Sequence, residues 1–210
     1  MTHWLDHSLV LASDYRVSHP ERVGPLLERR APALLDVGAH HVLVYASTTD
    51  PERVLVVIAL HAREPLLDIL HSRVLFEWFD AIGVDDIPAV FAGELFERLE
   101  LGAGSPDTVP GVVVSMVTPV GDLEILRDHV RDTRDEMSRA GVRRLSVFSA
   151  LDNPLEVMML LQIDDEEHAQ HWLQNSELAA EWLTRAGVGA YPPVFVGRFQ
   201  SLVRIDPRRP

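Results

Sequence analysis

The sequence predicts an α+β protein built from two tandem ferredoxin-like βαββαβ units whose antiparallel sheets pair with each other. Two observations lead to this prediction. An internal repeat covers both halves of the chain, and each half shows the same order of strand and helix patterns. A duplication of this kind means that each half forms one supersecondary unit and that the two cores are built in the same way.

The repeat is clearest near the end of each half. Residues 77–93 read EWFDAIGVDDIPAVFAG and residues 181–197 read EWLTRAGVGAYPPVFVG, with eight of 17 positions identical. The match extends backwards through both halves with one single-residue gap. We therefore expect a first repeat over residues 1–101, a Gly/Pro/Ser-rich linker over residues 102–111 and a second repeat over residues 112–210.

Each repeat has the order strand, helix, strand, strand, helix, strand. The first helix of the second repeat, residues 122–140, has an apolar stripe of period near 3.6, and Gly141 follows as a stop signal. In the first repeat Pro25 and Pro32 fall inside the same helix, so we expect it to be broken and to open a pocket there. The other predicted elements are first strands at 9–13 and 112–117, middle strands at 42–47 and 54–61, second helices at 64–81 and 166–186, and last strands after Pro88 and Pro192.

This order is the ferredoxin-like motif, in which helices cover one face of an antiparallel sheet. A single unit leaves the other sheet face bare, and that face must be buried. Two units in one chain can bury these faces against each other.

Composition excludes several classes of function. The 210 residues include no cysteine, and all 19 basic residues are arginine, which excludes thiolate chemistry and lysine Schiff bases. The net charge of −13 and the absence of long basic clusters argue against nucleic acid and acidic membranes as partners. The chain has no apolar run near the roughly 20 residues needed to span a bilayer, and its first residues do not read as a signal peptide. We expect a cytoplasmic protein.

The element order, the repeat length and the duplicated EW…GV…P.VF.G segment resemble the dimeric α/β-barrel superfamily, which includes the antibiotic-biosynthesis-monooxygenase (ABM) domains. The resemblance implies that the two sheets form an intrachain barrel, with a pocket between each sheet and its helices. Such pockets are often used without a metal or organic cofactor, so no cofactor is expected. The implied partner is a small apolar or aromatic molecule. The tandem arrangement is compatible with a monomer or a homodimer.

Haem degradation is one activity in this superfamily, and the sequence argues against it. The resemblance implies a strand asparagine for that reaction, whereas the two asparagines here, Asn153 and Asn175, fall in a turn and a helix. Fold alone does not decide among the remaining activities, which include oxygenases, isomerases and proteins of no established activity.

Two histidines are candidate acid–base catalysts. His61 at a strand end and His71 in the second helix fall where the resemblance places the pocket of the first repeat. Imidazole titrates near neutral pH, as a general acid or base must. Asp164 and Gln174 or Asn175 stand at these positions in the second repeat, so only the first repeat is expected to hold this pair. The alternative is that both histidines are ordinary surface or packing residues.

Aromatic and acidic residues near the same pocket are candidate substrate contacts. Each of them also has a structural interpretation: the tryptophans can anchor the second helix, and the glutamates can be solvated helix residues. The candidates are Trp78, Tyr15, Tyr45, Glu77 and Trp182.

The remaining histidines do not predict a metal site. His40 and His41 are neighbours in a strand, so we expect their side chains to point to opposite faces. His168 and His171 share a helix face, but spacing supplies no third ligand, and a polar helix surface is the simpler interpretation.

Two functions remain open. The first is a cofactor-independent oxygenase or related enzyme, in which a histidine removes a proton and the carbanion reacts with oxygen. The second is a non-catalytic small-molecule-binding or scaffold protein with degenerate pockets. A cleft of about 300 Å³ or more with converging polar groups would favour a ligand site.

Overall fold

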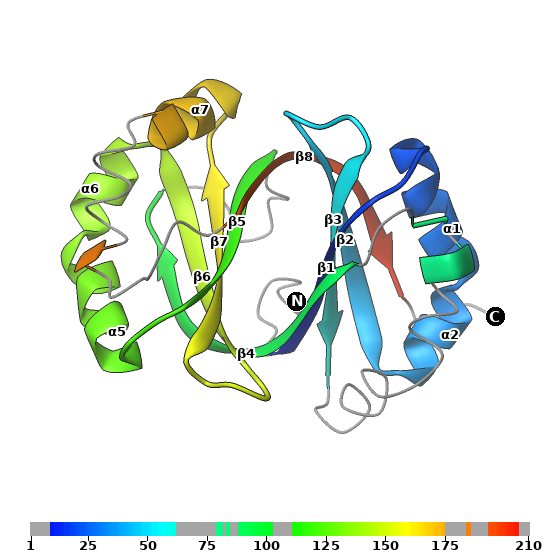
Figure 1. Ribbon diagram of the computed structural model, residues 1–210, viewed down its shortest axis with the longest axis horizontal. Coiled ribbons are helices and arrows are strands. Elements are labelled where there is room, and N and C mark those ends of the chain that lie inside the picture. Colours follow the sequence, from blue (N-terminus) through cyan, green and yellow to red (C-terminus); the bar gives the residue numbers. More distant parts are fainter. Residues whose placement is uncertain are drawn as a thin grey trace. The chain divides into compact units, whose positions relative to one another are not determined.

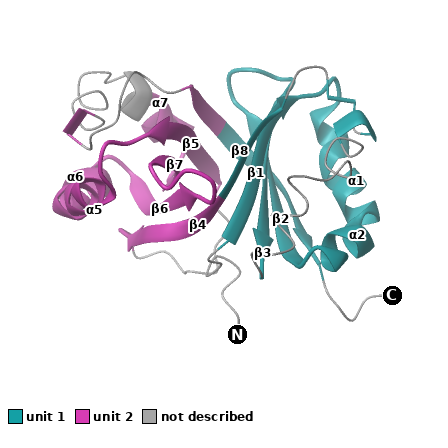
Figure 2. Ribbon diagram, turned by 60° about the horizontal axis from the view of Figure 1, so that its bottom comes forward, with its two compact units in different colours: residues 1–92, 197–210 teal, residues 93–196 magenta. Residues whose placement is uncertain are grey.

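The computed structural model divides the chain into two compact units (Figure 2). Unit 1 comprises residues 1–92 and 197–210, and unit 2 comprises residues 93–196. The last segment of the chain therefore belongs to the unit that the first segment forms. The residues that the structure describes are 9–61, 79–81, 83–84, 88–102, 111–174, 184–185 and 193–205.

The described strands of unit 1 form an antiparallel sheet (Figure 1). Across the sheet they are β1 (Leu9–Arg16), β3 (Arg53–Leu60), β2 (Ala39–Ser47) and the second part of β8 (Val194–Arg204). Strand β3 reads RVLVVIAL, and most of its side chains are buried. Valine and isoleucine dominate it because β-branched side chains suit a pleated surface.

Unit 2 repeats the arrangement. Its described strands are β5 (Val112–Pro119), β7 (Glu156–Ile163), β6 (Val142–Ala150) and the second part of β4 (Ala89–Glu100), again antiparallel. The two sheets thus use corresponding strands of the two repeats in the same order.

The last strand of each repeat begins in one unit and ends in the other. Strand β4 starts in unit 1 and pairs with β6 of unit 2 from Gly93 onward. Strand β8 starts in unit 2 and pairs with β2 of unit 1 from Gly197 onward. The compact units are therefore not the same segments as the predicted repeats, because each repeat ends in the other unit. The division into repeats 1–101 and 112–210 stays a prediction about the sequence duplication.

The first helical region is broken in both units. Unit 1 has a short 3-10 turn η1 (Pro20–Arg22) followed by α1 (Val23–Arg29) and α2 (Ala31–Asp36). Unit 2 has α5 (Leu123–Asp132) and α6 (Arg134–Arg139). As Figure 1 shows, these helices lie over one face of the sheet of their own unit.

The expected break in the first repeat is confirmed, but the uninterrupted helix predicted over residues 122–140 is wrong. The breaks fall at Arg30 and Thr133, which align with each other in the repeat. The Thr133 hydroxyl donates to the backbone oxygen of His129 at 2.7 Å, and such bonds bend helices. Unit 2 thus breaks at the aligned position without a proline.

A helix begins at the place predicted for the second helix of the second repeat. This helix, α7, spans Glu166–Gln174. Most of the corresponding predicted helix at 64–81 lies outside the described residues. No helix in the part of the chain that the structure describes is long and apolar enough to cross a membrane.

Each unit has an apolar core between its helices and its sheet. In unit 1, Leu27 of α1 is fully buried in a cluster with Val44 and Val203. In unit 2, Leu126 and Met159 occupy the comparable cluster. Complete burial of a side chain of this size stabilises the fold by about 1.5–3 kcal/mol, so these clusters hold the helices on the sheets.

Candidate functional site

The two tyrosines predicted to contact a substrate lie on opposite faces of the unit 1 sheet. Tyr15 belongs to the helix-side core and packs edge-on against Phe79 with ring centroids 5.5 Å apart. Tyr45 packs against Phe199 of β8 at 6.1 Å. Their partners on β3 are the adjacent residues Val54 and Leu55, whose side chains alternate between faces. At most one of these tyrosines can therefore line a given pocket.

Tyr15 is buried deeply enough to change its chemistry. Its side chain is 3% exposed, and its hydroxyl has no hydrogen-bond partner in the described structure. Burial raises the pKa of the Tyr15 hydroxyl well above its ordinary value, because a phenolate would lose its hydration. Tyr15 therefore stays neutral and acts as an apolar core residue with an uncompensated hydroxyl.

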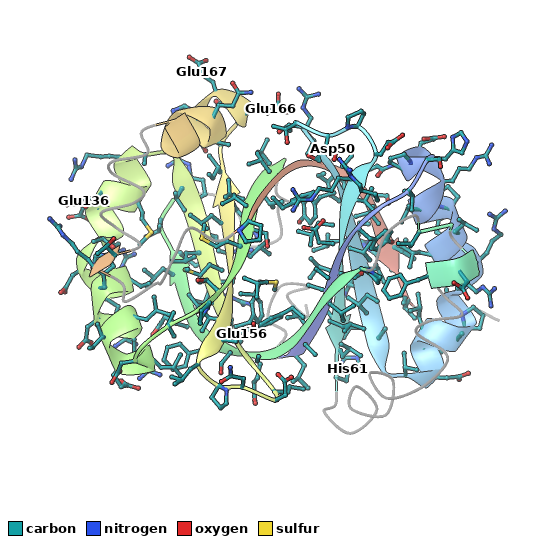
Figure 3. All side chains as sticks on the ribbon, in the orientation of Figure 1. Asp50, His61, Glu136, Glu156, Glu166 and Glu167 are labelled. Atoms are coloured by element: carbon teal, nitrogen blue, oxygen red, sulfur yellow. The ribbon has the colours of Figure 1, made fainter. Side chains whose placement is uncertain are left out.

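His61 lies at an exposed end of the sheet of unit 1. Figure 3 shows it at the opposite end of β3 from Asp50. Its backbone N–H donates to the oxygen of Gly38 at 3.0 Å, which holds the end of β3 beside the start of β2. Its ring lies against that of His40, with centroids 4.3 Å apart and planes 39° apart. His61 thus belongs to a cluster of histidines.

The prediction that His40 and His41 point to opposite faces is wrong. A bulge between Ala39 and His41 inserts an extra residue into β2, so two residues of β2 stand where one is expected and the alternation of side chains is interrupted. The Nδ1 atoms of His40 and His41 lie 2.7 Å apart, and the rings meet edge-on at 4.9 Å. Side-chain alternation applies only to a regular strand, and no local pattern of residues indicates the bulge.

Arg204 of β8 completes this cluster. It is the pairing partner of His41 across the β2–β8 ladder. Burial, the charge of Arg204 and the charge of His61, in that order, lower the pKa of His41 below its ordinary value. His41 is therefore a neutral imidazole at pH 7 and carries a lone pair that can accept a proton. We refer to His40, His41, His61 and Arg204 as the histidine corner.

A hollow of about 670 Å³ adjoins the histidine corner in unit 1. Its buried wall includes Val203 and Ile205 of the β8 segment, and its four charged residues are exposed. Arg204 lines the hollow, and the backbone N–H of Ile205 donates to the oxygen of His40 at 2.9 Å. The described residues that line the hollow are Glu28, Arg29, Ala31, Pro32, Leu35, Asp36, Leu202, Val203, Arg204 and Ile205.

Of the predicted site residues that the structure describes, Tyr15, Tyr45 and His61, none lines this hollow. The one sequence signal that pointed to it was the broken helix of the first repeat, since Pro32 is part of the wall. His71, Glu77, Trp78 and Trp182 lie outside the described residues, so their roles stay predictions. His41 and Arg204 were missed because a bulge and a distant strand bring them together.

The described residues contain no group of three or more His, Asp or Glu side chains arranged to hold a metal ion. His168 at the start of α7 lies beside Asp165, with Nδ1 2.9 Å from the carboxylate oxygen. Both residues are exposed, and hydrogen bonding to Asp165 raises the pKa of His168. The pair fits the polar helix surface expected there. The side chain of His171 lies outside the described residues.

Comparison with known proteins places the chain by its fold. No family model matches the sequence, and no curated protein matches it. Among solved structures, an anthrone oxidase-like protein has a TM-score of 0.68 at 15% identity, over 98% of this chain and 96% of that one. A candidate monooxygenase from Fusobacterium nucleatum subsp. nucleatum has a TM-score of 0.61 at 10% identity, over 95% of each chain.

A third structure connects the chain to the ABM group. It is a ferredoxin-fold protein from Listeria monocytogenes 4b F2365 related to antibiotic biosynthesis monooxygenases. Its TM-score is 0.51 at 9% identity, over 95% of this chain and 98% of that one. The predicted fold class is therefore confirmed: the chain has the α+β fold of ABM-like, dimeric α/β-barrel proteins over nearly its whole length. Identity at this level establishes the fold and leaves the activity open.

Proposed function

We propose that this protein is a cofactor-independent oxygenase, or a closely related enzyme, acting on an apolar or aromatic small molecule in unit 1. The observation that carries the proposal is the hollow of about 670 Å³ beside the histidine corner. This volume lies within the range of about 300–1,000 Å³ typical of ligand pockets. An open hollow argues against the alternative in which the pockets are packed shut.

The histidine corner supplies a base for such a reaction. A neutral imidazole, that of His41, takes a proton from a C–H group made acidic by a neighbouring carbonyl or phenol. His61 is a second candidate for this role. Arg204 stabilises the enolate that forms, because its guanidinium carries a fixed positive charge. His71 remains a further candidate base from the sequence.

The oxidant in this scheme is molecular oxygen. The carbanion transfers an electron to O₂, and the two radicals combine to form a C–O bond and a peroxide anion, which takes a proton. The remaining C–H proton is then lost as the O–O bond breaks and hydroxide leaves, so CH₂ becomes C=O. The sum is R₂CH₂ + O₂ → R₂C=O + H₂O. Carbon loses four electrons and the two oxygen atoms gain four.

A non-catalytic binding protein is the second candidate. The observation that favours it is that neither His41 nor His61 is among the residues lining the hollow. In that case the hollow holds a ligand and the histidines do not touch its reactive atoms. We also propose that the protein is cytoplasmic and that it is a monomer or a homodimer.

Oxygen uptake distinguishes the two candidates. Anthrone is a suitable probe because its CH₂ group is acidified by a carbonyl and its product, anthraquinone, absorbs differently. We expect uptake of one O₂ per anthrone above the protein-free rate at pH 7, and a loss of at least about tenfold in H41Q or H61Q. H168Q, a histidine change in unit 2, is the matched control and should keep full activity. Binding without uptake would support the non-catalytic candidate.

A native mass spectrum and an absorbance spectrum of freshly purified protein complete the test. A co-purified apolar molecule would identify the ligand class directly. A chromophore would overturn the cofactor-independent form of the proposal.

A further inference from the structure

The histidine corner has a structural counterpart in unit 2, built by the same backbone. Both β2 and β6 carry a bulge at aligned positions, between Ala39 and His41 and between Val142 and Arg144. Aligned backbone hydrogen bonds close both corners. The N–H of His61 donates to the carbonyl oxygen of Gly38 at 3.0 Å, and the N–H of Asp164 donates to that of Gly141 at 3.1 Å. A third pair links the neighbouring strand, from Ile205 to His40 at 2.9 Å and from Leu101 to Arg143 at 2.8 Å.

Ion pairs neutralise the corner of unit 2. The side chain of Arg143 binds both carboxylate oxygens of Asp164. Arg144, which is 4% exposed, donates from Nε to Glu100 at 2.5 Å. Two arginines and two carboxylates therefore balance at these four positions, and planar arginine–carboxylate pairs of this kind are strong and specific in geometry.

The corner of unit 1 carries no carboxylate at the same four positions. His40, His41 and His61 replace Arg143, Arg144 and Asp164, and Arg204 replaces Glu100. Among the described residues, no carboxylate lies within ion-pair distance of Arg204. Unit 2 shows that this backbone corner closes without any histidine. The backbone of the corner therefore does not by itself require histidine at these positions.

The charge of the corner decides between a cation and an anion as its ligand. Arg204 has a permanent positive charge and lies opposite His41 across the β2–β8 ladder, so it makes the potential at that imidazole more positive. A divalent metal would have to bind against this charge, and the described residues provide no set of three metal ligands. An anion would gain from the same potential and from imidazole donors.

We propose that the histidine corner recognises the carboxylate of a small organic acid whose apolar body occupies the adjoining hollow. Arg204 belongs both to the corner and to the lining of the hollow, so the apolar part of a ligand whose carboxylate binds Arg204 can lie among the apolar residues of that lining. Guanidinium and carboxylate match in a two-point geometry. Glu28 and Asp36 also line the hollow and repel additional negative charge, so the preferred ligand is a monoanion. The inference goes beyond the proposed function, because an anion site would serve a binding protein equally well.

The test compares two probes of closely similar shape, the anion 2-naphthoate and the neutral 2-naphthamide, by isothermal titration calorimetry at pH 7 and low salt. The wild-type protein should bind naphthoate at least about tenfold more tightly than naphthamide. R204Q should lose this preference while its affinity for naphthamide stays unchanged, and R204K should keep part of it. The double variant R143Q/D164N alters the corresponding corner of unit 2 and is the matched control, with the preference intact.

A second variant converts the corner of unit 1 toward that of unit 2. H40R/H61D introduces the pair that closes unit 2 on the same backbone, so it should fold, lose the part of the preference for naphthoate that the imidazoles supply and keep the part that Arg204 supplies. Equal affinity of the two probes for the wild type, or an undiminished preference in R204Q, would overturn the inference. Failure of both probes to bind at millimolar concentration would also overturn it. None of these results depends on oxygen uptake, so a failure of the anion-binding inference can be distinguished from a failure of the proposed catalysis.

Discussion

Two aligned glycines offer a test of how closely the two units match and where they differ. Gly38 and Gly141 both end the first helical region with a positive φ, 77° and 85°, a conformation that favours glycine. A Cβ atom built on Gly38 meets nothing within 4 Å. The same atom on Gly141 would lie 2.8, 2.9 and 3.0 Å from Cδ2, Cγ and Cβ of His168. An alanine at either position therefore pays the energetic cost of a positive φ. Only the alanine at Gly141 also clashes with a neighbouring side chain.

The expected magnitudes follow from these two terms. An alanine in the left-handed region costs about 1–2 kcal/mol, and its reduced freedom in the unfolded chain returns about 0.4–1 kcal/mol. Gly38→Ala should thus lower the free energy of unfolding by about 1 kcal/mol. In Gly141→Ala, His168 must move away from its 2.9 Å contact with Asp165, and overpacking adds about 1–3 kcal/mol. We expect a total of about 2–4 kcal/mol.

Urea unfolding followed by far-UV circular dichroism measures both variants. A double-mutant cycle with His168→Ala isolates the steric term within unit 2, because the alanine removes the ring that the new Cβ meets. Gly141→Ala should therefore destabilise the His168→Ala variant by at least about 1 kcal/mol less than it destabilises the wild type. Equal destabilisation by the two glycine variants, together with no coupling to His168, would refute the reasoning.

Three further changes test individual features. Tyr15→Phe should leave the free energy of unfolding unchanged or raise it by about 1 kcal/mol, because it removes a buried, unpaired hydroxyl; a clear loss of stability in urea would contradict this. The folded-state pKa of His41 lies below the ordinary 6.5, so the unfolded chain binds the proton more tightly. The free energy of unfolding should therefore fall as the pH drops from about 6.5 to the lowered pKa of His41. The difference between the urea midpoints at pH 7.5 and pH 5.5 should be smaller in His41→Gln than in the wild type. Asp122→Ala should lower the melting temperature through a loss of about 1 kcal/mol, because the Asp122 carboxylate accepts the N–H groups of Glu124 and Ile125 at 2.7 and 3.1 Å; an unchanged melting temperature would show that this cap contributes nothing.

The duplication and the order of strands and helices could be predicted from the amino-acid sequence alone. Strand and helix periodicities are local patterns, and the aligned EW…GV…P.VF.G segments fix the correspondence between the two halves. The break in the first helical region was foreseen from Pro32 in unit 1 but not at Thr133 in unit 2, where a side-chain hydrogen bond to His129 accompanies it. Such a bond is a weak local signal and competes with strong helix formers around it.

The site depended on features that no local pattern carries. His61 was recognised as a candidate from the sequence, but its contact with His40 depends on the bulge in β2. Arg204 is 163 residues away from His41 in the sequence, and the pairing of β2 with β8 brings the two residues together. One signal was present in the sequence: His40, His41 and His61 replace two arginines and an aspartate of the second repeat. The meaning of that replacement emerged only in three dimensions, where the unit 2 residues prove to be ion pairs and no carboxylate among the described residues lies within ion-pair distance of Arg204. Periodicity is set by neighbours in the chain, whereas charge balance and pocket shape are set by residues that folding alone brings together.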